Sequence, residues 1–284
     1  MTKIYTFTIS AGGGGKTTIT GNGGFYLAEK KNKRVLFIDE DQSCALTSVL
    51  TKPMADEIGV DHAEFLESVD GSKYSVKGIY EKKDDDPIPL KITDNISLIA
   101  GYSQLPDYEG VAGKNMGMSI AQWYDRNKEW IEANFDYILI DTHNDEAENH
   151  FLTSAFYASD VVVAVLPADN TVFGKIPILK ERLELINSAS RSGNKKFVVV
   201  GNKFLSNAGD PTESRETTKR FEELMAEEPE TYLGYFKYRA KWLGAFKSSG
   251  IPITQKAKKK SGQSQSDKQF IEDCWKLMDK IFKY

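Results

Sequence analysis

A glycine-rich run near the start of the chain constrains the fold more than any other feature. Residues Gly12–Thr18 read GGGGKTT, and they stand between an apolar segment, Ile4–Ile9, and a segment with a helical pattern, Thr17–Lys31. Glycines between a strand and a helix allow backbone N–H groups to converge on phosphate oxygens at the start of the helix. The run therefore predicts a phosphate-binding loop at the end of a β-strand.

The residue types in this loop match the chemistry of a nucleoside triphosphate and its metal ion. A lysine after the last glycine binds the β- and γ-phosphates, and the hydroxyl residue that follows it binds Mg²⁺. Lys16 and Thr17 occupy these two places. The predicted nucleotide-binding residues of the loop are Gly12, Gly13, Gly14, Gly15, Lys16, Thr17 and Thr18.

Apolar runs alternate with helical patterns along most of the chain. The further runs are Arg34–Asp39, Ile96–Gly101, Asp136–Asp141, Asp160–Pro167 and Lys196–Asn202. Continuous apolar strands that alternate with helices indicate a mostly parallel, twisted sheet with helices on both faces. We predict an α/β fold of the P-loop NTPase type, as a single domain over residues 1–284 with a polar insertion at about 51–90. A last helix is expected over Lys268–Lys283.

The composition argues against several classes of protein. Cys44 and Cys274 are the two cysteines, which indicates a reducing compartment rather than a disulfide framework. There is no apolar run of transmembrane length, and the start MTKIYTFTISAGG is too polar for a signal peptide, so we expect a cytoplasmic protein. The net charge is −4, so any binding to nucleic acid would need a local basic patch.

The spacing of the loop departs from the usual pattern G-x-x-x-x-G-K-[ST], whose first glycine would fall on Ser10. It instead resembles the deviant loop K-G-G-x-G-K-[ST]-[ST] of the ATPases related to ParA and MinD and of the nitrogenase iron protein. The resemblance extends over about residues 3–283, with its motifs in the family's order. The leading lysine of that pattern falls on Ala11. In the family this lysine reaches across an ATP sandwich dimer to the partner's phosphates.

Two acidic residues follow the second apolar run. The segment Val35–Leu50 resembles the family's second phosphate-site segment, and its D-x-D pair is Asp39 and Asp41. The resemblance implies that Asp41 orients the attacking water and is catalytic together with Lys16. It implies that Asp39 supports Mg²⁺ or the loop.

A third acidic residue ends the run Asp136–Asp141. Residues Phe135–Asp169 resemble the family's Walker B strand and its sequel. Asp141 would then hold Mg²⁺ through water, so the implied metal-site residues are Thr17, Asp39 and Asp141. His143, two residues later, is either a catalytic base or an ordinary loop histidine.

The segment Val198–Asn207 bears on the identity of the base. A GTPase would read N-K-x-D, whose acid pairs with guanine, but the fourth position here is Leu205. In ParA-like proteins an asparagine after this strand contacts adenine, which implies that role for Asn202. Pro252 matches the family's G-x-P-[IV] segment, which packs on the base. The expected ligands are therefore ATP and Mg²⁺.

The resemblance also implies partners. The partitioning branch is favoured, in its short form without a helix-turn-helix before the loop. Its members form a homodimer on ATP binding, bind nonspecific DNA on the nucleoid, and are stimulated to hydrolyse ATP by a centromere-binding, ParB-like adaptor. A basic patch gives phosphate binding without base reading. The candidate DNA-binding residues are Arg239, Lys241, Lys256, Lys258, Lys259 and Lys260. The lysine run is alternatively a solvated loop.

The last helix separates this reading from a MinD-like membrane ATPase, which would need a terminal amphipathic anchor. One stripe of the helix is apolar, and its other face mixes acids with lysines. A membrane anchor would favour mainly basic residues there. We therefore expect this helix to dock onto the protein core, and we expect no membrane partner.

Ala11 bears on hydrolysis. A lysine–phosphate contact across a dimer contributes about 1.5–3 kcal/mol to binding, and charge supplied in trans accelerates phosphoryl transfer by about 10³–10⁵. Because Lys16 is present, we expect ATP binding to be retained while turnover is impaired. Ala11 could be an engineered substitution, could mark a natural branch, or could belong to an ATP-gated switch without useful turnover.

Overall fold

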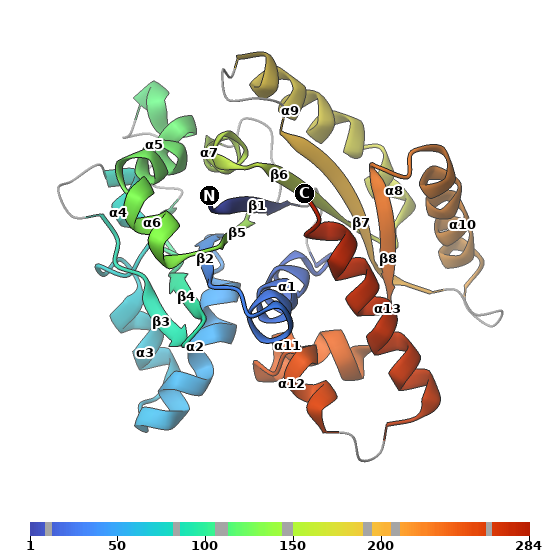
Figure 1. Ribbon diagram of the computed structural model, residues 1–284, viewed down its shortest axis with the longest axis horizontal. Helices are drawn as coiled ribbons and strands as arrows, with labels where there is room; N and C mark the ends of the chain where they lie inside the picture. Colours follow the sequence, from blue (N-terminus) through green and yellow to red (C-terminus); the bar gives the residue numbers. More distant parts are fainter. Residues whose placement is uncertain are drawn as a thin grey trace.

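A single mixed sheet organises the chain. The computed structural model describes residues 1–8, 13–81, 86–105, 113–143, 150–189, 195–205, 211–259 and 263–284 (Figure 1). Its described strands form an eight-stranded sheet in the order β3-β4-β2-β5-β1-β6-β7-β8. Neighbouring strands are parallel except for β3, which is antiparallel to β4. The strands are β1 (Lys3–Thr8), β2 (Val35–Glu40), β3 (Leu90–Thr93), β4 (Ile96–Ile99), β5 (Tyr137–Thr142), β6 (Val161–Pro167), β7 (Lys196–Phe204) and β8 (Tyr232–Lys237).

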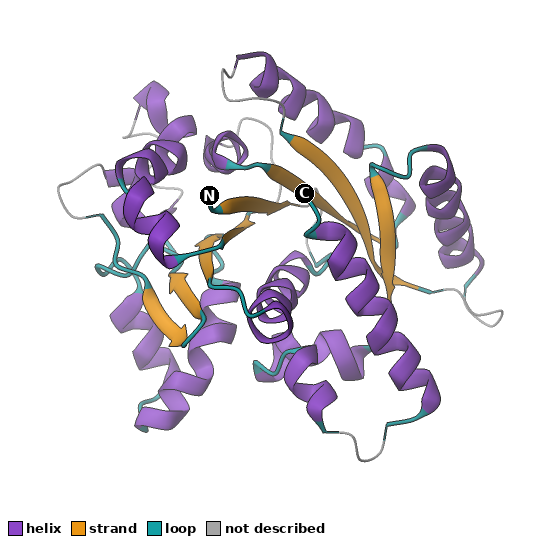
Figure 2. Cartoon of the chain, in the orientation of Figure 1, coloured by secondary structure: helices purple, strands orange, loops and turns teal. Residues whose placement is uncertain are grey.

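Helices cover both faces of the sheet (Figure 2). One face carries α1 (Lys16–Lys31), α2 (Ala45–Ile58), α3 (His62–Val69), the π-helix η3 (Ala240–Gly244), α11 (Ala245–Ser249), α12 (Ile253–Lys258) and α13 (Gln265–Ile281). The other face carries α4 (Lys77–Glu81), the 3₁₀ helix η2 (Gly113–Met118), α5 (Ser119–Arg126), α6 (Lys128–Asn134), α7 (His150–Ala158), α8 (Asn170–Phe173), α9 (Ile176–Ala189) and α10 (Thr212–Glu227). The predicted α/β class is confirmed.

The strands are apolar throughout because both of their faces are covered. Along β2, Val35 and Phe37 pack on the side of α1, whereas Leu36 and Ile38 pack on the side of α5 and α7. A strand buried on both faces shows no alternation of apolar and polar residues. The six predicted strands are confirmed to within about two residues at each end. The strands β3 and β8 were not predicted.

The last helix docks onto the sheet, as its apolar stripe predicted. Phe270, Cys274, Met278 and Ile281 of α13 are buried in the same core as α1. The following residue, Phe282, packs edge-on against Tyr5 of β1, with 5.1 Å between the ring centroids. None of the described helices has the length and apolar character needed to cross a membrane.

The region predicted as a polar insertion contains the end of α2, then α3 and α4, and leads into β3. α3 begins with a side-chain cap, because the Asp61 carboxylate accepts hydrogen bonds from the backbone N–H groups of Ala63 and Glu64. Val69 and Tyr80 anchor α3 and α4 to the two faces of the sheet. That this region is an insertion on a single domain stays a prediction.

Candidate functional site

A cavity of about 540 Å³ lies where β1 and β2 end and α1 begins. This volume is in the range of about 300–1,000 Å³ that is usual for small-molecule sites. Its walls come from the glycine loop and the start of α1, from the β2–α2 connection, from the end of β7 and from the segments that follow β8. The lining residues are Gly13, Gly14, Gly15, Lys16, Thr17, Thr18, Asp41, Ser43, Ala45, Lys203, Tyr238, Ala240, Gly244, Lys247 and Ser248.

The loop forms one wall of this cavity. α1 begins at Lys16, and its preceding residue, Gly15, has φ +88°, in the left-handed region that glycine tolerates best. A Cβ atom on Gly15 would overlap the side-chain amide of Asn202. The first N–H groups of a helix lack intrahelical partners and attract anions. Gly12 and Ala11 lie outside the described residues.

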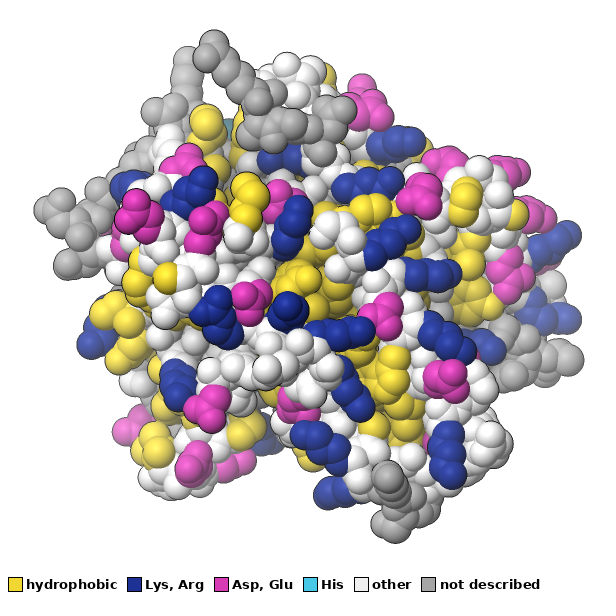
Figure 3. All heavy atoms as spheres, viewed as in Figure 1, with side chains coloured by type: hydrophobic (Ala, Val, Ile, Leu, Met, Phe, Trp, Pro, Cys, Tyr) yellow, Lys and Arg dark blue, Asp and Glu magenta, His cyan; other side chains and the backbone are white. Residues whose placement is uncertain are grey.

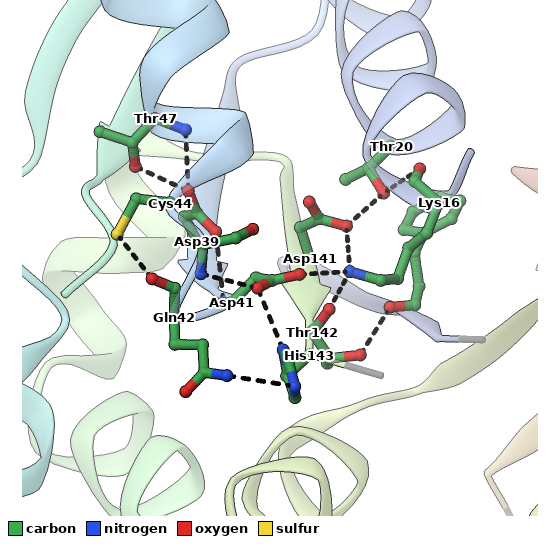
Figure 4. Close-up of polar contacts among 12 residues, drawn as sticks. Lys16, Thr20, Asp39, Asp41, Gln42, Cys44, Thr47, Asp141, Thr142 and His143 are labelled. Carbon is green, nitrogen blue, oxygen red and sulfur yellow. Dashed lines mark hydrogen bonds and ion pairs between the residues drawn. The ribbon is translucent and has the colours of Figure 1, made fainter. Parts of the chain in front are cut away.

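Lys16 occupies the floor of the site and is 4% exposed. Its Nζ lies 3.2 Å from Asp141 Oδ1 and 3.3 Å from Asp41 Oδ2, and it donates a hydrogen bond to the Thr142 carbonyl (Figure 4). Burial alone would lower the pKa of Lys16, but the charges of Asp141 and Asp41 raise it. Lys16 is therefore a protonated lysine that two carboxylates hold at the mouth of the loop.

Asp141 lies near the end of β5, and its register partner on the neighbouring strand β2 is Asp39. Its Oδ1 accepts hydrogen bonds from Lys16 and from the Thr20 hydroxyl at 3.3 Å, while its buried Oδ2 has no hydrogen-bond partner among the described residues. Burial raises the pKa of Asp141, and the charge of Lys16 opposes that rise. A buried carboxylate oxygen without a partner beside a phosphate loop fits a hydrated Mg²⁺ ion.

Asp39 accepts hydrogen bonds from a residue of α2 and is not among the described lining residues of the cavity. Its Oδ2 accepts hydrogen bonds from the backbone N–H of Thr47 at 2.8 Å and from the Thr47 hydroxyl at 2.7 Å. The same hydroxyl accepts the N–H of Gly101 at 2.7 Å. Burial and the nearby charge of Asp141 raise the pKa of Asp39 to about 7. These contacts fix the β2–α2 connection, and the metal role of Asp39 stays a prediction.

Asp41 faces the cavity and is ionised. Burial favours its neutral form, but Lys16, the Ser43 backbone and His143 together hold the pKa of Asp41 below its ordinary value. Its Oδ1 accepts the N–H of Ser43 at 2.9 Å and lies 3.1 Å from Nδ1 of His143. An ionised carboxylate beside the phosphate loop can orient a water molecule.

The ring of His143 contacts two other residues of the site, Asp41 and Gln42. Its Nδ1 faces Asp41, and its Nε2 lies 3.4 Å from Nε2 of Gln42 (Figure 4). The histidine therefore contacts the Asp41 carboxylate, and both of its predicted roles, catalytic base or ordinary loop histidine, stay predictions.

Asn202 and Pro252 lie beside the cavity without being among its described lining residues. The Asn202 side-chain amide donates to the Gly14 carbonyl at 2.8 Å and so supports the loop from below. Pro252 is buried at the N-cap of α12, and the next N–H, of Ile253, donates to Asn22 Oδ1 at 2.8 Å. Their predicted contacts with the base stay predictions.

Three of the six predicted DNA-binding cations have acidic neighbours among the described residues. Arg239 and Lys241 lie 3.5 and 3.4 Å from the Asp267 carboxylate, and Lys258 lies 2.8 Å from Glu29. Lysine and acidic side chains are interspersed on the face that carries α13 (Figure 3). Lys256 is half-buried and Lys259 is exposed, and Lys260 lies outside the described residues.

The structure adds residues that the sequence did not single out. Thr20 stands one turn after Lys16 on α1, and this four-residue spacing on one helix face was an available signal. Lys203 and Tyr238 also line the cavity. Lys203 is the lysine of the segment compared with N-K-x-D, whereas no motif includes Tyr238.

Comparisons with known proteins bear on the family and the fold. A family model described as an AAA domain matches residues 2–197. An uncharacterised ATP-binding protein of Methanocaldococcus jannaschii is 27% identical over 289 residues, which cover 99% of this chain and 89% of that protein.

Two solved structures have the same fold. One is a plasmid partition protein of Borrelia burgdorferi bound to AMPPNP, with a TM-score of 0.73 and 19% identity over 100% of this chain and 99% of that one. The other is a variant of McdA from Cyanothece in complex with ATP, with a TM-score of 0.72 and 16% identity over 99% and 95% of the two chains. The chain therefore belongs to the AAA domain family, and it has the P-loop ATPase fold of the ParA-type proteins.

Proposed function

We propose that this chain is a Mg²⁺-dependent ATPase of the ParA type that acts in partitioning DNA in the cytoplasm. The observation that carries the proposal is the direct contact of Lys16 with Asp41 and Asp141 at the start of α1, inside a cavity of nucleotide size. Phosphoryl transfer uses a lysine at the phosphates, an acid that holds Mg²⁺ and a group that orients water. Lys16, Asp141 and Asp41 would serve these three roles.

ATP binding would redistribute the contacts of Lys16. Its ammonium is shared between Asp41, Asp141 and the Thr142 carbonyl. Phosphate oxygens at the loop would accept hydrogen bonds from Lys16 in place of these partners. Thr17 and the free oxygen of Asp141 are then available to hold Mg²⁺ and its water ligands. The metal ion supplies positive charge that neutralises the phosphate oxygens.

Asp41 would orient the attacking water, and His143 and Ser43 would fix the direction of its carboxylate. Ala11 replaces the lysine that would reach a partner's phosphates in a sandwich dimer. Turnover of this form would therefore be low while ATP binding is retained, because Lys16 and the loop remain.

The remaining functions follow from the resemblance to partitioning ATPases. ATP would join two copies face to face, the dimer would bind DNA without sequence preference, and a centromere-binding adaptor would stimulate hydrolysis and release. Among the candidate DNA contacts, Lys256 and Lys259 would be the more available, because Arg239, Lys241 and Lys258 have acidic neighbours.

Steady-state ATP turnover tests the enzymatic part of the proposal. The chain would be compared with an Ala11→Lys variant, each with and without plain duplex DNA. We expect the lysine variant to turn over ATP faster, and DNA retention of both to depend on ATP and to decrease with salt. If both hydrolyse ATP equally, the dimer contact assigned to position 11 is wrong.

Nucleotide binding is tested separately with Lys16→Ala and with Lys52→Ala, a matched change of an exposed lysine on α2. Loss of ATP binding in the first variant alone supports the assigned site. No ATP binding by the unmodified chain overturns the proposal.

A second function is favoured by one observation, namely Ala11 itself. A chain without the trans-acting lysine could serve as an ATP-gated DNA-binding switch that does not hydrolyse ATP. DNA binding that depends on ATP, with no measurable turnover in the presence of any adaptor, would select the switch. Binding to liposomes without binding to DNA would instead select a MinD-like membrane role.

A further inference from the structure

A second cavity, of about 520 Å³, lies at the opposite end of the sheet from the phosphate loop. Residues at the starts of β1, β6 and β7, on α5 and at the end of α7 line it; the start of β1 is marked N in Figure 1. β1 has six residues and spans about 20 Å, so the two cavities lie well apart. The volume suits a small molecule, and the proposed function uses none of the lining residues.

The walls of this second cavity carry more positive than negative charge. Four lysines and two acids are among its described lining residues, namely Lys3, Lys128, Lys195, Lys196, Asp125 and Asp160. The chain as a whole has a net charge of −4. A cleft with an excess of one charge concentrates ions of the opposite charge. The local balance therefore favours an anionic ligand.

Three of these lysines lack an acidic partner in the part of the chain that the structure describes. Lys3 and Lys128 form no ion pair there, and the Nζ of Lys196 lies over the Tyr284 ring, 5.1 Å from its centre. Elsewhere on the surface, the Nζ atoms of Lys31 and Lys258 lie 2.6 and 2.8 Å from a carboxylate. The ammonium groups at the cavity are thus available to a ligand.

The fourth lysine, Lys195, is positioned by the end of α7. Its Nζ donates hydrogen bonds to the carbonyls of Tyr157 and Ser159 at 2.8 and 2.9 Å. An ammonium has three N–H donors, so these two bonds leave one for a ligand. Burial lowers the pKa of Lys195, and the charge of Asp160 opposes that effect. The Asp160 carboxylate also accepts the backbone N–H of Ile4 at 2.9 Å, and a bound anion would add to its support of the ammonium.

Tyrosine rings supply an apolar part of the wall. Tyr124, Tyr157 and Tyr284 are half-buried and line the cavity. The Tyr124 hydroxyl donates to Glu132 at 3.1 Å, and the Tyr284 hydroxyl donates to Glu230 at 3.0 Å. Neither acid lines the cavity, so these hydroxyls are directed to partners outside it. Rings fixed in this way offer contact to a flat apolar group.

We propose that this cavity is a second ligand site, for a small organic anion that carries carboxylate or phosphate groups on a flat apolar body. Lys3, Lys195 and Lys196 would bind the negative groups, and the tyrosine rings would contact the body. The cavity shares no described lining residue with the phosphate cavity. The proposal therefore does not rest on the proposed function.

The test titrates the chain with phenyl phosphate, with phthalate and with inorganic phosphate, by isothermal titration calorimetry. At least one of the two aromatic anions is expected to bind with a Kd of about 1 mM or below, and the one that binds identifies the negative group. Inorganic phosphate lacks the apolar body and should bind about tenfold more weakly or not at all.

Two variants locate the bound probe. Lys3→Gln combined with Lys196→Gln should weaken the aromatic anion about tenfold or more, because charge-assisted hydrogen bonds are lost. The matched control, Lys52→Gln combined with Lys219→Gln, removes the same charge from two exposed lysines of α2 and α10 and should leave the Kd unchanged. Melting temperatures would establish that each variant is folded.

A third variant fills the cavity without a change of charge. Ala121 is half-buried on α5 and lines the cavity, so Ala121→Trp should abolish binding of the probe. Lys16→Ala, at the phosphate loop, should leave it unchanged.

Three results would overturn the proposal. One is that neither aromatic anion binds at about 10 mM. Another is that the two lysine pairs weaken binding equally, because the effect would then be one of net charge. The third is loss of binding in Lys16→Ala, which would place the probe at the phosphate loop. Failure of the chain to bind ATP would contradict the proposed function alone.

Discussion

The ammonium of Lys16 and the carboxylate of Asp141 lie 3.2 Å apart where α1 begins and β5 ends, and the side chains are 5% and 0% exposed. Each group would be costly to bury alone. Lys16, Asp141 and Asp41 compensate one another's charges, and this allows all three to be buried. The residues of the predicted binding site therefore also determine the stability of the nucleotide-free chain.

Lys16→Met should destabilise the nucleotide-free chain, because Asp141 loses its buried cation. We expect a loss of about 3–5 kcal/mol at about pH 8. The loss should be smaller at about pH 5, because Asp141, whose pKa burial already raises, can take up a proton and become neutral. Urea unfolding at both pH values measures the difference. Lys52→Met, on an exposed lysine, should change stability by less than about 0.5 kcal/mol. Equal losses at the two pH values would contradict the argument.

Asp41→Asn should abolish most hydrolysis while leaving ATP binding within a few-fold. The amide cannot orient or deprotonate water as the ionised carboxylate can, so turnover should fall by about 10²–10⁴. Turnover is best measured in an Ala11→Lys background. Asp56→Asn, on an exposed acid of α2, is the matched control. Retention of full activity by the Asp41 variant would exclude Asp41 as the water-positioning residue.

The pKa of Asp39, raised to about 7 by burial and by Asp141, predicts a pH dependence of stability. An unfolded aspartate titrates near about 3.9, so between these values the folded chain binds more protons than the unfolded chain. The free energy of unfolding should therefore decrease as pH rises through this window, by at most about 1.4 kcal/mol per pH unit. Unfolding curves without Mg²⁺ measure the slope, and Asp39→Asn should flatten it. If the slope is unchanged in Asp39→Asn, another titrating group causes the pH dependence of stability.

Asp267 predicts that the free energy of unfolding rises with pH in the acidic range, opposite to the effect of Asp39. The Trp242 indole N–H donates to its carboxylate at 2.7 Å, and Asp267 also completes a capping box with Ser264 at the start of α13. The indole, followed by the Ser264 backbone, lowers the pKa of Asp267. Its stabilising contribution is thus present above the ordinary aspartate pKa and lost as pH falls below it. Thermal unfolding from about pH 7 to about pH 3 should show this loss, and Asp267→Asn should remove it.

Ser264→Ala tests the other half of the capping box. Loss of the cap should cost about 1 kcal/mol at neutral pH. The acid dependence should weaken without vanishing, because the Ser264 hydroxyl and the Trp242 indole both donate to the Asp267 carboxylate. An acid dependence equal to that of the unmodified chain would contradict the contribution of the hydroxyl.

The strands that could be predicted are those buried on both faces, because their sequences are continuously apolar. β3 was not predicted because it has only four residues, which alternate between half-buried and exposed. β8 escaped because Gly234 interrupts it, with φ +146°, and because two of its six residues face outward. Edge strands depend on tertiary pairing, which a local pattern does not contain.

The phosphate end of the site could be predicted for a related reason. Lys16 follows a glycine loop, and Asp39 and Asp141 end neighbouring parallel strands, so their positions follow from the topology. The far end could not be predicted in this way. Lys203 reaches the cavity through a bulge and a positive φ, and neither is visible in the letters around it.

The contact of Tyr5 with Phe282 has a consequence for how the chain matures. β1 occupies an interior position of the sheet, yet the ring that covers its Tyr5 comes from a residue near the far end of the described chain. This part of the core therefore closes through a contact of very long sequence separation, which is formed slowly. Chains interrupted before α13 should leave Tyr5 without this cover and should depend most on chaperones.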